Sequence, residues 1–308
     1  MINRPDLKIK IGKIELKNPV MPASGTFGYG LEYEDEINLS KLGAIVIKGI
    51  SLKPSKGNPS PRVVETPSGL LNAVGLENIG IENFLQKKLP KLIKYKTPII
   101  TNIYGKSEED YIELARIIDK EKDIAGIEVN ISCPNVKKGG LTFGTSPESC
   151  FNLISKIRVV TGKTLIVKLT PNITDIRPIA KSAEDAGADA ISLINTITGM
   201  AIDIKTRKPM LANITGGLSG PAIRPIGVRM VYEASSVVKI PVIGIGGITS
   251  FENALEYIIA GATAVQIGTG NLINPKTCEI IINKVSNYLK KNQILSISDL
   301  KRSIVYNA

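Results

Sequence analysis

The sequence predicts a (β/α)8 barrel, and two features of the chain carry that prediction. Eight short apolar runs recur along the 308 residues, and longer amphipathic stretches fall between them. Each run is continuously apolar rather than alternating, as expected for parallel strands that are buried on both faces. Eight such units favour a closed barrel over an open doubly wound sheet, and we expect a single domain that spans residues 1–308.

The eight predicted strands are rich in Ile, Val and Leu and end near Gly, Asn or Ser. In chain order they are Asn18–Ala23, Ala44–Gly49, Pro98–Ile103, Gly126–Ser132, Leu165–Thr170, Ala190–Asn195, Pro241–Gly247 and Ala264–Gly270. Helices are expected between them because capping residues and terminal glycines mark their ends. The clearest of these helices are Ser107–Lys120, Ser146–Val160, Asp175–Ala186 and Ser250–Ala260.

Three connections are too long for bare loops in a compact domain. They are Ser51–Asn78, Cys133–Pro147 and Thr196–Pro221. Each follows the carboxyl end of a predicted strand, which is the face that holds the active site in barrels of this type. Because long ordered loops usually serve a function, we expect all three to contribute to a site.

The absence of histidine is the most restrictive feature of the composition. It excludes a Ser-His-Asp triad, a Cys-His dyad and zinc bound by histidine. The three cysteines, Cys133, Cys150 and Cys278, are widely spaced, so neither a disulfide framework nor a CxxC metal site is encoded. We therefore expect no metal site and a reducing, cytoplasmic location.

The net charge of +11 raises the question of an anionic partner. The lysines are spread as pairs over helix-like segments such as LQKKLPKLIKYK, which is typical of a solvated surface, so we expect no nucleic-acid partner. The N-terminal residues lack the apolar core of a signal peptide, and the apolar runs are too short to cross a bilayer. We accordingly expect no membrane association.

Polar side chains stand at the carboxyl ends of the predicted strands, where barrel side chains converge on one site. They are Ser24, Lys48, Asn102, Asn130, Lys168 and Asn195. A lysine within an apolar strand is costly unless it is paired or faces a ligand. Lys48 and Lys168 therefore predict an anionic or electron-rich ligand, with the alternative that each pairs with a buried carboxylate such as Glu128.

Glycines end the last two predicted strands, in GIGG (Gly244–Gly247) and IGTG (Ile267–Gly270). Glycines allow backbone N–H groups to approach a phosphate, and barrels often bind phosphate after strands seven and eight. The two motifs together predict a phosphorylated ligand. No GxGxxG opens a strand–turn–helix unit early in the chain, so a Rossmann NAD site is not indicated.

Cys133 lies in the polar segment NISCPN, just after the fourth predicted strand. A free thiol has a pKa of about 8.5, which is closer to neutrality than the pKa of Lys or Tyr. In a chain without histidine, Cys133 is therefore the best candidate for a general base. We interpret Cys150 and Cys278 as packing residues because both lie in helix-like segments.

These residues together resemble the dihydroorotate dehydrogenases, FMN enzymes of pyrimidine biosynthesis with a (β/α)8 barrel. The resemblance is most specific in GNPSPRVVETPSGLLNAVGLENIG (Gly57–Gly80), NISCPN and INTITGM. The membrane-bound class of the family uses serine as its base and carries an N-terminal extension. A cysteine at position 133 and the lack of such an extension resemble class 1, and the long Gly57–Gly80 motif resembles the NAD-linked class 1B.

The resemblance implies oxidation of dihydroorotate to orotate, in which Cys133 takes the C5 proton and a hydride passes from C6 to one FMN per chain. Lys48 is implied as a second catalytic residue that stabilises negative charge. The implied FMN contacts are Ser24, Lys48, Gly49, Asn102, Asn130, Lys168, Ile194, Gly220, Gly246, Gly247, Gly268 and Thr269. The implied substrate contacts are Lys48, Asn72, Ala73, Val74, Gly75, Leu76, Asn130, Asn195 and Thr196.

The class 1B resemblance also implies a partner subunit that carries FAD and a 2Fe–2S cluster and passes electrons to NAD. The chain would then form a homodimer within a heterotetramer. Two enzyme alternatives remain: a class 1A homodimer that reduces fumarate, and a tRNA dihydrouridine synthase, another FMN barrel with a loop cysteine. The second would need an appended RNA-binding domain, for which we expect too little chain after the last helix. A barrel that only scaffolds a partner is the non-enzymatic alternative.

Overall fold

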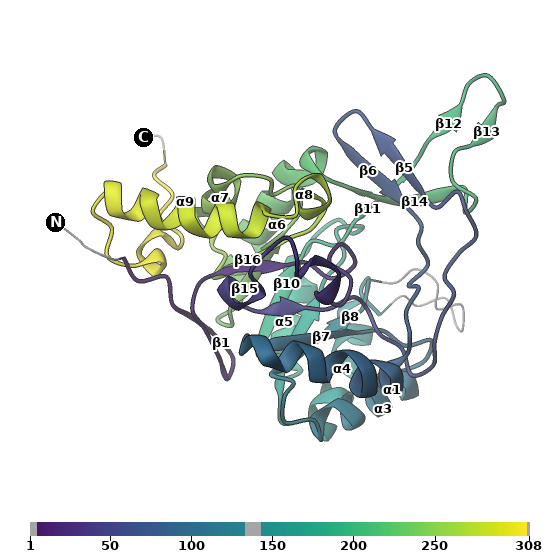
Figure 1. The fold of residues 1–308 in the computed structure, drawn as a ribbon, viewed down its shortest axis with the longest axis horizontal. Helices are drawn as coiled ribbons and strands as arrows, with labels where there is room; N and C mark the ends of the chain where they lie inside the picture. The colour runs from purple at the N-terminus through teal and green to yellow at the C-terminus, as the bar shows by residue number, and fades with distance from the viewer. Residues whose placement is uncertain (1–4, 133–142, 307–308) are drawn as a thin grey trace.

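The computed structural model describes residues 5–132 and 143–306, and its central element is an eight-stranded parallel sheet (Figure 1). Its strands, in spatial order, are β3 (Val20–Pro22), β16 (Ala264–Ile267), β15 (Val242–Ile245), β10 (Ala190–Leu193), β9 (Thr164–Lys168), β8 (Gly126–Asn130), β7 (Ile99–Ile103) and β4 (Ile45–Val46). The Gly43 amide donates to the Val20 carbonyl at 2.9 Å, which brings the two outer strands together. All eight predicted strands and the barrel class are thus confirmed.

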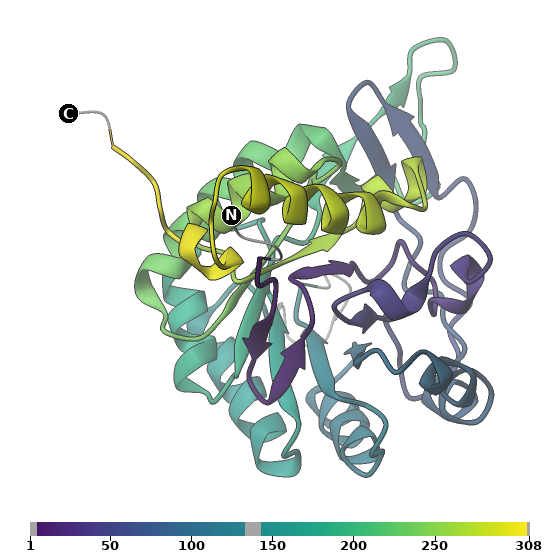
Figure 2. The same ribbon diagram turned by 60° about the vertical axis from the view of Figure 1, so that its left-hand side comes forward.

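Helices follow the strands and cover the outside of the sheet (Figure 2). They are α1 (Ile81–Asn83), α2 (Leu89–Leu92), α3 (Glu108–Asp119), α4 (Pro147–Val160), α5 (Arg177–Asp185), α6 (Arg224–Val237), α7 (Phe251–Ala260), α8 (Thr269–Ile273) and α9 (Thr277–Lys291). A π-helical turn at Phe84–Lys88 joins α1 to α2. The four predicted helices are confirmed, each within two residues of its expected ends.

Local chemistry explains where these helices begin and end. The hydroxyl groups of Ser107, Ser146 and Ser250 accept hydrogen bonds from backbone amides in the first turns of α3, α4 and α7. Gly261 ends α7 with a φ of 130°, which a residue with a side chain rarely adopts. These hydrogen bonds and the conformation of Gly261 explain why the capping residues in the sequence predicted the helix ends correctly.

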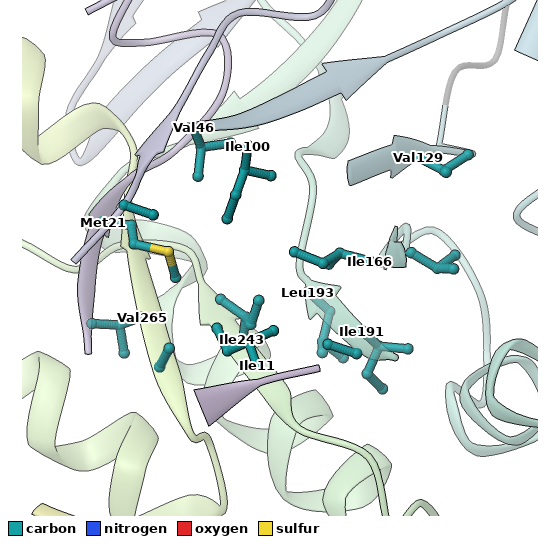
Figure 3. Packing of buried hydrophobic residues seen from close by; sticks show 14 of the residues in the cluster. Ile11, Met21, Val46, Ile100, Val129, Ile166, Ile191, Leu193, Ile243 and Val265 are labelled. Atoms are coloured by element: carbon teal, nitrogen blue, oxygen red, sulfur yellow. The ribbon is translucent and has the colours of Figure 1, made fainter. Parts of the chain in front are cut away.

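A hairpin of β1 (Ile9–Ile11) and β2 (Ile14–Leu16) lies at the amino-terminal end of the barrel (Figure 2). The Lys13 amide donates to Oγ1 of Thr164, the first residue of β9, at 2.9 Å. Ile11 is fully buried and lies near Ile243 of β15 (Figure 3). The hairpin thus covers the amino-terminal end of the barrel, a feature that was not predicted from the sequence.

Isoleucine, valine and methionine side chains fill the middle of the barrel (Figure 3). The strand register pairs Ile100 with Val46, Ser192 with Ile243, and Glu128 with Ile166. Paired residues of neighbouring strands share a face of the sheet, so apolar and polar side chains both line this interior. The apolar layer forms the core, and the polar layer lies toward the carboxyl ends of the strands.

A second, antiparallel sheet is built from two of the long connections. Its strands are β11 (Ile197–Met200), β14 (Thr215–Ser219), β6 (Gly69–Asn72) and β5 (Val63–Thr66), in that order, and a small hairpin of β12 (Ile202–Asp203) and β13 (Lys208–Pro209) extends from it. Figure 1 shows this sheet beyond the carboxyl ends of the barrel strands. The expectation that these connections are more than bare loops is confirmed, although their pairing was not foreseen.

Across residues 5–132 and 143–306, no helix is both long enough and apolar enough to cross a membrane.

Candidate active site

A buried carboxylate lies at the centre of the polar layer inside the barrel. Glu128 of β8 is 0% exposed, and its side chain accepts three hydrogen bonds from three other strands of the barrel, β7, β10 and β16. The donors are Asn102 Nδ2 at 2.7 Å, Ser192 Oγ at 2.9 Å and Gln266 Nε2 at 2.8 Å. Burying a carboxylate is costly unless hydrogen bonds and a countercharge compensate it. From the sequence, Glu128 was expected only as an alternative partner for a lysine, and Ser192 and Gln266 were not among the predicted site residues.

Lys168 ends β9 and supplies the nearest positive charge to Glu128. Its Nζ atom lies 3.9 Å from Glu128 Oε1 and donates a hydrogen bond to Ser24 Oγ at 3.0 Å. The lysine side chain is almost fully buried. The alternative of a lysine paired with a buried carboxylate is therefore confirmed in part, because the shorter contact is to Ser24.

Lys48 has a different environment. Its backbone amide donates to the Gly28 carbonyl at 2.8 Å, which holds the segment after β4 against the segment after β3. Within residues 5–132 and 143–306, its half-buried ammonium group has no hydrogen-bond or ion-pair partner. The pairing alternative thus finds no support for Lys48, and its ammonium group remains available for a ligand.

Asn130, at the end of β8, and Asn195, after the end of β10, contact each other at the carboxyl ends of the strands. Asn195 Nδ2 donates to Asn130 Oδ1 at 3.3 Å, and the Ser132 amide donates to the same oxygen at 3.2 Å. The Thr196 amide donates to Asn195 Oδ1 at 2.8 Å. The predicted substrate contacts Asn130, Asn195 and Thr196 are therefore neighbours in space, although β9 and β10 lie between Asn130 and the other two in the sequence.

The predicted substrate segment Asn72–Leu76 leaves the end of β6 and is held along its length. Asn72 Nδ2 donates to the Gly217 carbonyl of β14 at 3.1 Å, and Asn58 Nδ2 donates to the Ala73 carbonyl at 2.9 Å. At the far end of the segment, Tyr104 OH donates to the Leu76 carbonyl at 2.9 Å. This anchoring keeps Asn72, Ala73, Val74, Gly75 and Leu76 half-buried in one ordered segment.

Asn78 and Tyr104 support that segment and were not singled out in the sequence. Asn78 is buried, and its Nδ2 atom donates to both Tyr104 OH and the Leu76 carbonyl at 2.9 Å. Leu76 itself has a φ of 58°, in the left-handed region that a leucine seldom adopts. The position of Asn78 within the Gly57–Gly80 motif was the sequence signal for this support.

The predicted phosphate-side glycines also gather in one place. Gly220, Gly246 and Gly247 have φ values of 98°, 124° and 66°. A Cβ atom on Gly247 would lie 2.9 Å from both the Gly220 carbonyl and the Arg224 amide. The close approach of three backbone segments therefore requires glycine at position 247.

Ile194, Gly268 and Thr269 border the same glycines. The Ile194 amide donates to the Ile245 carbonyl at 2.9 Å, just before Gly246. Thr269 begins α8, and its Oγ1 atom donates to Ser219 Oγ at 2.8 Å. Every predicted FMN contact thus lies at the carboxyl end of the barrel or on the segments packed over it.

Cys133, the predicted general base, lies outside the described residues. The other two cysteines are buried packing residues, as expected: Cys150 in α4 and Cys278 in α9. Desolvation raises the pKa of each thiol from 9.0 to about 12. The raised pKa makes both thiols poor candidates for a general base near neutral pH.

Comparison with known proteins places this site in a family. A family model described as dihydroorotate dehydrogenase matches residues 6–289. The chain is 53% identical over 304 residues to the dihydroorotate dehydrogenase B (NAD(+)) catalytic subunit of Geotalea uraniireducens, covering 99% of this chain and 100% of that one. It is 54% identical to the proteins of the same name from Geotalea daltonii (96% and 97% covered) and a Thermoanaerobacter species (97% and 99%). The chain belongs to the dihydroorotate dehydrogenase family.

Proposed function

We propose that this chain oxidises dihydroorotate to orotate in pyrimidine biosynthesis, as the FMN-bearing catalytic subunit of an NAD-linked enzyme. The names of its relatives support the reaction and the acceptor. The observation that carries the proposal is the polar cluster of Ser24, Lys168 and Asn102 around Glu128 at the carboxyl end of the barrel. Among the described residues the Lys48 ammonium group has no hydrogen-bond or ion-pair partner, and the residue that follows it, Gly49, lies against Asn102. This arrangement suits an anionic, hydrogen-bonding ring system.

The residues present fit an FMN. Among the described residues, Asn102 Oδ1 is buried without a hydrogen-bond partner, so it offers an acceptor to a ligand N–H group. A Cβ atom on Gly49 would lie 3.0 Å from that oxygen and would begin to cover it. The glycines at positions 220, 246 and 247 have no side chains to keep a phosphate group from nearby backbone N–H donors. These features support binding of a ring system and of a phosphate group at the site.

FMN, when bound, supplies the hydride-accepting chemistry that no amino acid side chain provides. In the proposal Ser24, Asn102, Asn130 and Lys168 hold its ring, and Lys48 stabilises negative charge beside ring and substrate. Asn72, Asn130 and Asn195 both donate and accept hydrogen bonds, as the polar edge of a pyrimidine requires. Cys133 takes the C5 proton of the substrate.

We further propose a homodimer that binds two copies of a partner subunit carrying FAD and a 2Fe–2S cluster, in the cytoplasm. The words "catalytic subunit" in the relatives' names support a separate partner. The described cysteines support a reducing compartment, because Cys150 and Cys278 are free thiols. Light scattering is expected to give twice the 33.1 kDa chain mass for the chain alone.

The test is to purify the chain with and without the subunit encoded beside it and to assay both. We expect yellow protein in both preparations, and dihydroorotate-dependent reduction of NAD only in the complex. Rapid fumarate reduction by the chain alone would instead assign the class 1A reaction. A colourless protein that binds no FMN would refute the proposal, and a salt-sensitive shift of tRNA would favour the synthase alternative.

Substitution of Cys133 tests the proposed base directly. Cys133→Ala is expected to retain bound FMN and lose most of its turnover, because the flavin contacts remain while the proton acceptor is gone. Cys133→Ser is expected to recover part of the rate at high pH, where a hydroxyl begins to act as a base. Cys278→Ala is the control, since that thiol is buried in α9 and has no role in the proposal. Wild-type turnover in Cys133→Ala would rule out the assignment.

A further inference from the structure

Glu128 lies directly beneath the proposed flavin site and has no role in the proposal above. It is buried on β8, one strand from Asn102 on β7 and one strand from Lys168 on β9. Both neighbours are proposed flavin contacts. The carboxylate therefore connects two residues that face the ligand without facing it itself.

The chemistry of a carboxylate determines how its amide partners are oriented. A carboxylate only accepts hydrogen bonds, so the side-chain amides of Asn102 and Gln266 must turn their NH2 groups toward Glu128. Their carbonyl oxygens then point away, and both are buried without partners in the described part of the chain. For Asn102, that oxygen faces Gly49. Glu128 thus determines which atom of Asn102 is offered to the ligand.

The carboxylate also balances the charge of Lys168. The Lys168 ammonium donates to Ser24 and lies 3.9 Å from Glu128, and the side chains of Lys168 and Glu128 are almost fully buried. Without a nearby negative charge, a buried ammonium group is strongly disfavoured. Glu128 and Lys168 would together contribute a negative and a positive charge to the electrostatic potential at a flavin held by Lys168 and Asn102.

We propose that Glu128 is a positioning residue for the flavin: it orients Asn102 as a hydrogen-bond acceptor and compensates the charge of Lys168. This inference rests on the proposed function, because it requires that FMN binds at this site. Glutamine at position 128 would remove the negative charge and could donate as well as accept. Asn102 could then rotate, and the charge of Lys168 would lack its partner.

The experiment compares Glu128→Gln and Glu128→Asp with Thr101→Val, a control on β7. Thr101 is fully buried, and its hydroxyl has no hydrogen-bond partner among the described residues, so the nearly isosteric valine removes no hydrogen bond within that part of the chain. Each purified protein is stripped of flavin and titrated with FMN. The midpoint potential of the bound FMN is then measured by equilibration with a reference dye.

We expect Glu128→Gln to weaken FMN binding at least about tenfold and to shift the midpoint potential to more positive values, because the charge of Lys168 is no longer offset. Glu128→Asp keeps the charge but shortens the reach to Asn102, so its affinity should fall while its potential stays near that of wild type. Thr101→Val should match wild type in both measurements. A purely structural role would change stability without moving the potential.

A double-mutant cycle provides the second test. If Glu128 acts through Asn102, the affinity lost in Glu128→Gln should be much smaller in an Asn102→Ala background. Wild-type affinity and potential in Glu128→Gln would overturn the inference and leave the proposed function intact. Should Glu128→Gln fail to fold, an unchanged affinity in Glu128→Asp would overturn it equally. Failure of the wild-type chain itself to bind FMN would refute the proposed function and, with it, this inference.

Discussion

Gly247→Ala is expected to destabilise the protein and to weaken FMN binding, for two separable reasons. Gly247 has a φ of 66°, and a left-handed conformation costs a residue with a side chain about 1–2 kcal/mol. The new Cβ atom would lie 2.9 Å from the Arg224 amide and from the Gly220 carbonyl. These are backbone atoms, which cannot move as a flexible side chain can, and overpacking of this kind adds about 1–3 kcal/mol.

The combined loss of about 3 kcal/mol converts into a change in melting temperature. Unfolding entropies near 2.1 cal/mol/K per residue give about 0.65 kcal/mol/K for a chain of this length, so Tm should fall by about 5 °C. Displacement of the Gly220 and Arg224 backbone would also open the proposed phosphate site. We expect the FMN dissociation constant to rise about tenfold, equivalent to about 1.4 kcal/mol.

Calorimetry and FMN titration of Gly247→Ala should be run beside two glycine controls. Gly187→Ala also has a positive φ, of 93°, but it meets only the flexible side chain of Arg158 and lies at the amino-terminal end of the barrel. It should lose stability without losing FMN affinity. Gly162→Ala meets nothing within 4 Å and should change neither. A Gly247→Ala protein with the Tm and FMN affinity of wild type would refute the reasoning.

Three further substitutions or conditions test other parts of the structure. Lys48→Met should lower kcat with dihydroorotate about tenfold or more, since charge stabilisation is lost; an unchanged steady-state rate would contradict the role of Lys48. The pKa of the Cys150 and Cys278 thiols is raised to about 12, so their contribution to stability is complete below pH 9 and declines as the pH rises toward 12. Denaturant titrations should show that decline, and it should be smaller in Cys278→Ala. Ser250→Ala removes the capping box of α7 and should cost about 1 kcal/mol in the same titrations.

The barrel could be predicted because its information is local. Eight apolar runs, serine caps such as Ser107 and Ser250, and terminal glycines each act through neighbours along the chain. The hairpin of β1 and β2 and the antiparallel sheet could not be predicted in the same way. Their strands are three to five residues long, and in the antiparallel sheet they pair residues as distant in sequence as Asn72 and Gly217. Such pairing depends on loop positions that only the folded barrel defines.

The candidate site likewise has a part that could be predicted from the sequence and a part that could not. The polar residues at the strand ends, Ser24, Lys48 and Lys168 among them, could be assigned to one site from the sequence, because parallel strands bring their carboxyl ends to one face whatever the rest of the fold does. The contact of Lys168 with Ser24 at 3.0 Å, and the lack of a partner for Lys48 among the described residues, are visible only in the folded chain. The same is true of the buried carboxylate of Glu128, which accepts hydrogen bonds from β7, β10 and β16. Side-chain hydrogen bonds act over a few ångströms, and only closure of the sheet brings these strands within that range.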